Sequence, residues 1–167
     1  MAPWSWTPEL APGLRSRALG SVPLVFAAAP PLARRVGRFP RGLDGLPLLL
    51  RGPNNPVTRR IERFLAERGI APRVEVRADD AELLHALVLA GRGVAALELP
   101  SIRADLEAGR LARLHAGPSG IRETVWLAAP DEKSARPGLE AALRALSGGF
   151  ALGRDLTADD RRIGLKS

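Results

Sequence analysis

The hydrophobic pattern between Leu48 and Pro100 predicts a strand, a helix, a strand, a helix and a third strand. Apolar runs at Leu48–Leu50 and Val94–Leu99 have the length of strands, and Arg73–Arg77 alternates polar and apolar residues as a half-buried strand does. Helical segments separate the strands, and crossovers of that kind predict a parallel sheet. The binding crevice of such a sheet lies at the carboxyl ends of its strands.

Turn and capping residues mark where the two helices begin. Asn55 has the side chain of a helix cap, Pro56 fits the first helical turn, and Asp79 or Asp80 is predicted to cap the second helix. The apolar stripe of the first helix is Val57, Ile61, Phe64 and Leu65, and that of the second is Leu83, Leu84, Leu87 and Val88.

Further elements are predicted on both sides of this unit. Two apolar strands, Val22–Pro30 and Glu123–Pro130, both end in Ala-Ala-Pro, so they are interpreted as two crossings between the same pair of lobes. The weaker predictions are a short strand at Leu14–Leu19, a single turn of helix at Pro31–Val36, a short helix capped by Ser101, a strand at Leu111–His115 and a helix at Ser134–Ser147.

Composition adds limits to this picture. The 167 residues are 46% hydrophobic, which is enough for a real core, and no apolar run is long enough to span a membrane. The N-terminus lacks the layout of a secretory signal, which predicts a cytoplasmic location. The net charge of +7 is carried mostly by arginine without interleaved aromatic residues, so we attribute it to composition and not to a nucleic-acid surface.

Polar residues at the predicted strand ends form the candidate binding site. Four of them lie in the loop and first turn after the first strand: Arg51, Asn54, Asn55 and Thr58. Four follow the third strand: Glu98, Leu99, Pro100 and Ser101. A helix N-terminus favours an anion, although an equally simple interpretation is that Asn55 only caps the helix and Arg51 is solvated.

The sequence offers little support for catalysis or for metal binding. Cysteine is absent, and His85 and His115 have no partner at ligand spacing, so each is interpreted as a packing or surface residue. Asp79, Asp80 and Glu82 fit helix capping better than paired catalytic carboxylates. We therefore predict no catalytic residue, no metal site and no cofactor.

The order of these segments resembles that of the effector-binding domain of LysR-type transcriptional regulators. The segments that carry the resemblance are LDGLPLLL, NNPVTRRIERFLAERGIAPRV, DDAELLHALVLAGRGVAALELP and ETVWLAAPDEKSARPGLEAALRAL. Within that family the chain looks most like the sodium/proton antiporter activators. The resemblance covers about residues 14–147 and implies that Arg51–Thr58 and Glu98–Ser101 contact an inducer.

The resemblance implies an α/β fold like that of type 2 periplasmic binding proteins, with one complete βαβαβ lobe and a partial first lobe joined by two crossover strands. The expected organisation is an irregular N-terminus (1–13), a remnant of the first lobe with the first hinge strand (14–47), the second lobe (48–116), the return strand with a C-terminal helix (117–149) and a tail (150–167).

The segments that are expected before Leu14 do not match the family, so we expect an N-terminally truncated chain that lacks the helix-turn-helix. Effector binding is then expected to be weak. The resemblance also implies a homodimer in the intact bacterial parent, with Ile61, Phe64 and Val74 facing the partner or the core, and DNA contact only through the missing module.

The expected function is effector binding and dimerisation for a LysR-type regulator, with a small molecule or ion as the effector and no membrane partner. Two alternatives stay open at this point. They are a free-standing small-solute-binding protein of the same fold and a small α/β enzyme of that fold.

Overall fold

The computed structural model describes residues 14–130 and residue 145. The predictions for 1–13, for Ser134–Ser147 and for the tail at 150–167 lie outside the described residues, apart from Ala145, which is helical. The elements in chain order are β1 (Leu14–Ala28), α1 (Pro30–Val36), the short 3-10 helix η1 (Arg41–Leu43), β2 (Pro47–Leu50), α2 (Pro56–Ala66), β3 (Arg73–Arg77), α3 (Ala81–Leu89), β4 (Ala95–Glu98), α4 (Leu99–Glu107), β5 (Ala112–Arg113) and β6 (Arg122–Pro130).

The chain divides into two compact units, and the division falls twice inside a strand. One unit is Pro23–Glu123, and the other comprises Met1–Val22 and Thr124–Ser167. The chain therefore passes between the units once in β1 and once in β6, and these two strands pair with each other. The segment from Pro23 to Pro47 belongs to the same unit as β2 to β5.

The sheet of the unit Pro23–Glu123 is mixed and not purely parallel. β2 pairs in parallel with β3, and a parallel bridge between Leu48 and Val94 joins β2 to the residue that precedes β4. β1 then lies antiparallel to both β4 and β5. The strand order is therefore β3-β2-β4-β1-β5. The parallel arrangement predicted for the strands of Leu48–Pro100 is confirmed, and β1, which lies outside that segment, makes the sheet mixed.

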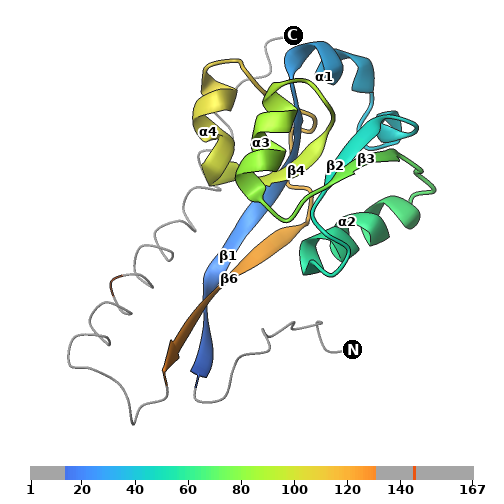
Figure 1. Ribbon diagram of the computed structural model, residues 1–167. Helices are drawn as coiled ribbons and strands as arrows, with labels where there is room; N and C mark the ends of the chain where they lie inside the picture. Colours follow the sequence, from blue (N-terminus) through green and yellow to red (C-terminus); the bar gives the residue numbers. More distant parts are fainter. Residues whose placement is uncertain (1–13, 131–144, 146–167) are drawn as a thin grey trace. The chain divides into compact units, whose positions relative to one another are not determined.

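Helices cover both faces of this sheet (Figure 1). On one face α1, η1 and α2 pack against alternate strand residues, which include Leu24, Phe26, Leu48 and Leu50. On the other face α3 and α4 pack against the remaining strand residues, which alternate with the first set and include Val25, Ala27, Leu49 and Leu97. Because successive strand residues point to opposite faces, an uninterrupted apolar strand supplies two cores at once.

Local sequence accounts for most element boundaries. The Asn55 side chain accepts a hydrogen bond from the Val57 amide at 2.8 Å, and the Asp80 side chain accepts one from the Leu83 amide at 2.9 Å, so both predicted caps are confirmed and Asp80 is the second one. The prediction that Ser101 caps a helix was wrong, because α4 begins at Leu99 with Pro100 in its first turn.

Three other predicted boundaries shift. Leu14–Leu19 is not a separate strand, because β1 runs without a break from Leu14 to Ala28. The helix predicted as a single turn is α1, which has seven residues. The strand predicted at Leu111–His115 is reduced to two residues, Ala112 and Arg113, which pair with the end of β1.

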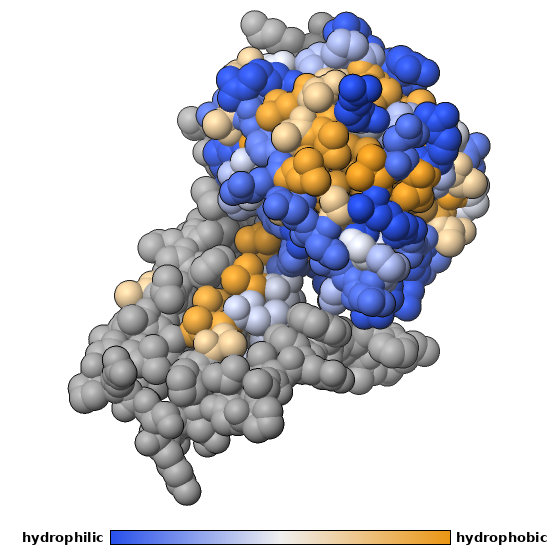
Figure 2. Space-filling view, viewed as in Figure 1, coloured by the Kyte–Doolittle hydropathy of each residue, from blue (hydrophilic) through white to orange (hydrophobic). Residues whose placement is uncertain are grey.

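Some apolar surface stays exposed on the face that carries α3 and β3. Figure 2 shows this apolar surface surrounded by hydrophilic residues. Among the described residues, the large hydrophobic side chains that are most exposed are Val74 at 41%, Leu83 at 49% and Leu89 at 36%. No described helix has the length and hydrophobicity that crossing a bilayer requires.

The close approach of β2 to β4 gives a stability prediction. A Cβ atom on Gly93 would lie 2.8 Å from Leu49 Cγ and 2.9 Å from the Pro47 carbonyl oxygen. We expect Gly93→Ala to lower the free energy of unfolding by about 1–3 kcal/mol, because the backbone there must shift. Urea unfolding measures the change.

Gly117→Ala is the matched control, because a Cβ atom there meets nothing within 4 Å and the backbone needs no positive φ. Equal stability of the two variants would contradict the packing argument.

Candidate functional site

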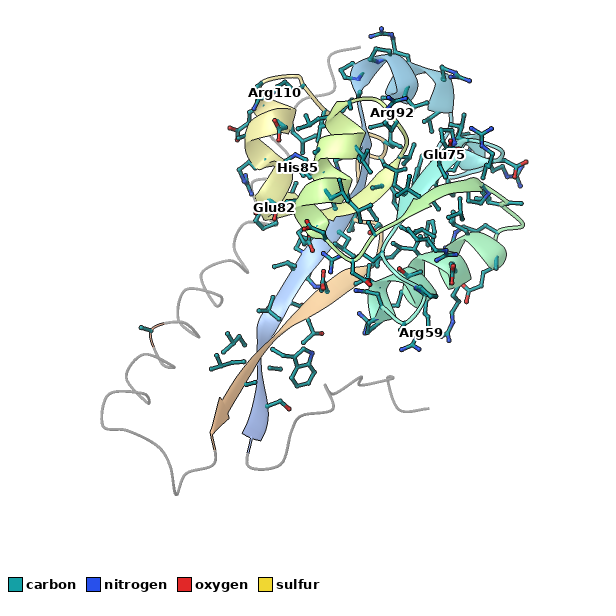
Figure 3. All side chains as sticks on the ribbon, viewed as in Figure 1. Arg59, Glu75, Glu82, His85, Arg92 and Arg110 are labelled. Carbon is teal, nitrogen blue, oxygen red and sulfur yellow. The ribbon has the colours of Figure 1, made fainter. Side chains whose placement is uncertain are left out.

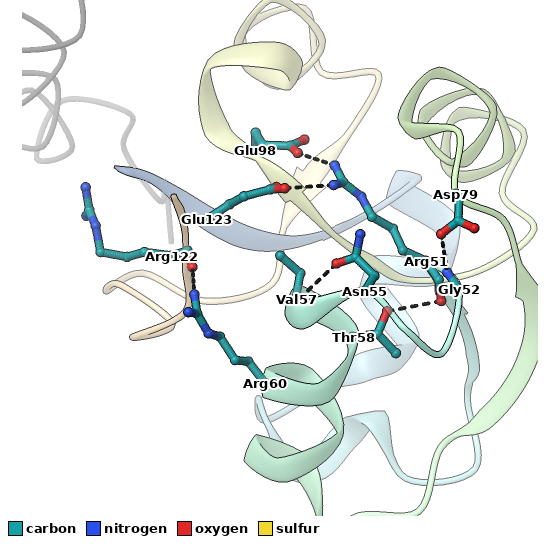
Figure 4. A network of polar contacts seen from close by, with 10 residues as sticks. All are labelled: Arg51, Gly52, Asn55, Val57, Thr58, Arg60, Asp79, Glu98, Arg122 and Glu123. Atoms are coloured by element: carbon teal, nitrogen blue, oxygen red, sulfur yellow. Dashed lines mark hydrogen bonds and ion pairs between the residues drawn. The ribbon is translucent and has the colours of Figure 1, made fainter. Parts of the chain in front are cut away.

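The loop between β2 and α2 lies at the carboxyl ends of the parallel strands, as predicted. Its conformation is held by two hydrogen bonds from neighbouring elements. The Gly52 amide donates to Asp79 Oδ1 at 2.9 Å, and Thr58 Oγ1 donates to the Arg51 carbonyl oxygen at 3.0 Å. Because Asp79 lies in the connection between β3 and α3 and Thr58 belongs to α2, the loop is held from both sides (Figure 4).

Gly52 is required by this arrangement. A Cβ atom at that position would lie 2.7 Å from Asp79 Oδ1, so any side chain would push the carboxylate away from the Gly52 amide. Asp79, interpreted from the sequence as a capping residue, is therefore a residue that shapes the loop. The signal in the sequence was the glycine next to a predicted strand end.

Arg51 is the centre of a network of charges. Its Nη1 atom lies 2.9 Å from Glu123 Oε1, and its Nη2 atom forms an ion pair with Glu98 Oε1. Only 18% of the Arg51 side chain is exposed. The solvated arginine considered from the sequence is thus not what the structure shows, and the charge of Arg51 is balanced by two carboxyl groups.

The two glutamates have pKa values shifted in opposite directions. Burial raises the pKa of Glu123 to about 7, and the hydrogen bond and charge of Glu98 add to this effect against the opposing influence of Arg51. Burial also acts to raise the pKa of Glu98, but its hydrogen bonds and the Arg51 guanidinium hold it below the usual value. The pair therefore holds one proton in mildly acidic solution and loses it as the pH rises through about 7.

Glu123 was not among the predicted site residues. It follows Arg122 at the start of a strand that is apolar from Val125 onward, and an acidic residue at that position was the available signal. Its proximity to Arg51 and Glu98 depends on the contact between three separate strand regions, which the spacing of residues does not reveal.

The predicted site residues divide by exposure. Asn54, Pro100 and Ser101 are exposed, and Arg51, Asn55 and Glu98 are half-buried. Thr58 and Leu99 are 1% and 5% exposed, so the structure removes them from the surface that a ligand can contact. Thr58 supports the loop through the Arg51 carbonyl, and Leu99 packs in the core beneath α3 and α4.

The three residues predicted for a dimer interface also differ in exposure. Ile61 is 3% exposed and lies in the core beside α1 and β2, so it faces the core of its own chain. Phe64 is half-buried and stacks near Phe26 and Phe39. Val74 is the exposed member of the three.

His85 and His115 each contact a specific group. His85 Nε2 lies 2.7 Å from Asp105 Oδ2, while Asp105 Oδ1 accepts a hydrogen bond from Arg110 Nε at 2.6 Å, so Asp105 ties α3 to α4 and to the residues after it. The Arg110 hydrogen bond, together with His85 and against the effect of burial, lowers the pKa of Asp105.

His115 Nε2 accepts a hydrogen bond from the Phe26 amide at 3.1 Å. Within residues 14–130, no group of three or more His, Cys, Asp or Glu side chains could hold a metal ion.

The loop geometry gives a prediction for Thr58. Replacing it by valine keeps the shape of the side chain but leaves the buried Arg51 carbonyl without its donor. We expect Thr58→Val to lower the free energy of unfolding by about 1–2 kcal/mol in urea titrations.

Thr58→Ser keeps the hydroxyl and removes a methyl group. If the serine variant loses more stability than the valine variant, the methyl packing and not the hydrogen bond is what Thr58 contributes.

Comparison with known proteins identifies the arrangement. A family model described as LysR substrate binding domain matches residues 5–151. The HTH-type transcriptional regulator CbbR of Rhodospirillum rubrum is 24% identical over 139 residues, which are 83% of this chain and 46% of CbbR. The chain therefore spans about half the length of this relative.

Solved structures show the same fold. The regulatory domain of HypT from Salmonella typhimurium, in its apo form, has a TM-score of 0.66 at 24% identity. The match covers 85% of this chain and 68% of the HypT chain. The effector domain of AmpR from Pseudomonas aeruginosa has a TM-score of 0.70 at 18% identity, with coverage of 86% and 68%. Together with the strand order, these neighbours confirm the α/β fold of the type 2 periplasmic-binding-protein kind.

Proposed function

The chain belongs to the LysR substrate binding domain family, and from this membership we propose that it binds a small-molecule or ion effector for a bacterial transcriptional regulator. The observation that carries the proposal is the meeting of the β2–α2 loop with the end of β4 at one edge of the sheet, joined through Arg51 and Glu98. This edge is where α/β sheets of this kind hold their ligands.

We propose that the effector contacts the residues of the site that stay accessible: Arg51, Asn54, Asn55, Glu98, Pro100 and Ser101. Asn54 offers both donors and acceptors. The charge of Arg51 is already balanced by Glu98 and Glu123, so an effector has to exchange hydrogen bonds with this network and cannot simply neutralise a free cation. Closure of two lobes on the effector would shift the geometry of a DNA-bound oligomer.

The relatives support a regulatory role over the two alternatives, because CbbR is named as a transcriptional regulator. We therefore propose a non-enzymatic, cytoplasmic domain that needs no cofactor. DNA contact would belong to a helix-turn-helix of the intact regulator. The similarity of NNPVTRRIERFLAERGIAPRV to sodium/proton antiporter activators supports that subgroup as a finer proposal and makes sodium one of the candidate effectors.

Effector binding is tested by a thermal-shift screen of the 167-residue chain with sodium salts, bromide salts and small organic acids. Bromide is included because the regulatory domain of HypT has a bromide-bound form. For a compound that raises the melting temperature in a concentration-dependent way, we expect Asn54→Ala and Arg51→Gln to weaken binding about tenfold in calorimetry, the loss of one hydrogen bond.

Arg59→Gln on the exposed side of α2 is the matched control and should bind as the unaltered chain does (Figure 3). If all three variants bind equally, the effector site does not lie at this edge of the sheet.

We also propose that the surface formed by α2 and β3 is a subunit contact of the intact regulator, with Val74 and the exposed part of Phe64 at its centre. Support comes from the position of β3, which among the described strands pairs only with β2 and so has one open edge. Charged residues along it, Arg73, Glu75 and Arg77, limit unspecific pairing of that edge.

Self-association of the chain tests this surface. We expect the chain alone to be monomeric when dilute and to associate as concentration rises, and we expect Val74→Glu to suppress that association. Light scattering over a concentration series measures it.

Leu83→Glu on α3 is the control, because Leu83 is even more exposed than Val74 but lies on another element. A stable dimer whose mass does not respond to Val74→Glu would contradict the proposed contact.

A further inference from the structure

Two carboxyl groups share a single guanidinium at the point where β6 begins. Arg51 contacts one oxygen of Glu98 and one of Glu123, and the two glutamate side chains are only 18% and 25% exposed. One cation cannot neutralise two carboxylates, and the excess negative charge is costly in a half-buried position. The cluster is therefore balanced only when one of the two carboxyls holds a proton.

The geometry indicates which glutamate holds it. Glu123 Oε2 is fully buried, and no donor from the described residues reaches it. Glu98 and Glu123 both contact the Arg51 guanidinium, and two carboxylates placed in this way without a proton repel each other. A proton on Glu123 removes the charge from this buried carboxyl and leaves the negative charge on Glu98, in agreement with the opposite shifts of their pKa values.

Among the described residues, Arg51 is the cation in contact with the pair. Figure 4 shows the Arg122 side chain directed away from the two glutamates, while its carbonyl oxygen accepts a 2.5 Å hydrogen bond from Arg60 Nη1 of α2. Asp79, at the end of β3, is engaged with the Gly52 amide. On the side of β1, the residue opposite Glu98 is the apolar Leu24.

We propose that Arg51, Glu98 and Glu123 form a proton-operated latch that fastens the start of β6 to the carboxyl end of β4. With the proton in place, the carboxyl pair and Arg51 join β2, β4 and β6. When the proton leaves, the two carboxylates repel each other and the start of β6 loosens. Glu123 is the last residue of its compact unit before the chain enters the other one at Thr124.

The direction of the pH dependence follows from the two shifts. The pKa of Glu123 is raised from 4.5 to about 7 in the folded chain, so its contribution to stability is complete below 4.5 and is lost as the pH rises through about 7. The pKa of Glu98 is lowered, so its contribution is present above 4.5 and is lost as the pH falls through the lowered value. The latch is therefore closed in mildly acidic solution and opens through neutrality.

Amide hydrogen exchange of the full 167-residue chain tests the latch. The Leu24 amide donates to the Ile121 carbonyl oxygen at 3.0 Å and reports whether the segment leading into β6 is in place. We expect its protection factor, corrected for intrinsic exchange, to fall about tenfold from about pH 6 to about pH 8. Glu123→Gln keeps an acceptor for Arg51 and a permanent donor for Glu98, so its protection factor should stay constant.

Glu62→Gln is the matched control, because Glu62 pairs with Arg77 on the exposed surface at 2.8 Å, and it should keep the fall of the unaltered chain. A carbon-13 titration of the Glu123 carboxyl in the unaltered chain, which needs no variant, should show a midpoint near 7. A midpoint in the ordinary range of glutamate, a constant protection factor in the unaltered chain, or an equal fall in Glu123→Gln would each overturn the proposal.

Discussion

The antiparallel insertion of β1 between β4 and β5 is the constraint on which the unit Pro23–Glu123 depends. Because β1 pairs with β4 on one side and with β5 on the other, its buried half sits in the middle of the sheet, where Leu24 and Phe26 supply one core and Val25 and Ala27 supply the other. Removing this strand would expose both apolar layers at once. The stability of the unit Pro23–Glu123 therefore depends on a strand whose first part, up to Val22, belongs to the other compact unit.

The same topology explains why charges gather at one edge of the sheet. β2 and β4 run in the same direction, so their carboxyl ends bring Arg51 and Glu98 together, and the return of the chain through β6 adds Glu123. Each member of this cluster comes from a different element, so the cluster connects β2, β4 and β6. It is also polar without carrying a large net charge, which suits recognition by exchanged hydrogen bonds better than attraction of a bare ion.

Much of the fold could be predicted from local patterns. Caps, proline positions and apolar periodicity identified α2, α3 and the strands from β2 to β4, since these signals act within one or two turns of chain. The direction and full length of β1 could not be predicted, because they depend on pairing with β4 and β5 far along the sequence. The site was predicted in part for the same reason: Arg51 and Glu98 follow strands, but the role of Glu123 arises only in three dimensions.

The contacts of Asp105 have a mechanical consequence. Asp105 belongs to α4, and its carboxylate contacts both His85 of α3 and Arg110 after α4. These contacts connect the two helices to each other. The first turn of α4 carries Pro100 and Ser101 at the edge of the sheet, whereas α3 carries Leu83 on the exposed face. Asp105 is thus the link through which a displacement of that first turn would reach α3 and the exposed face that carries Leu83.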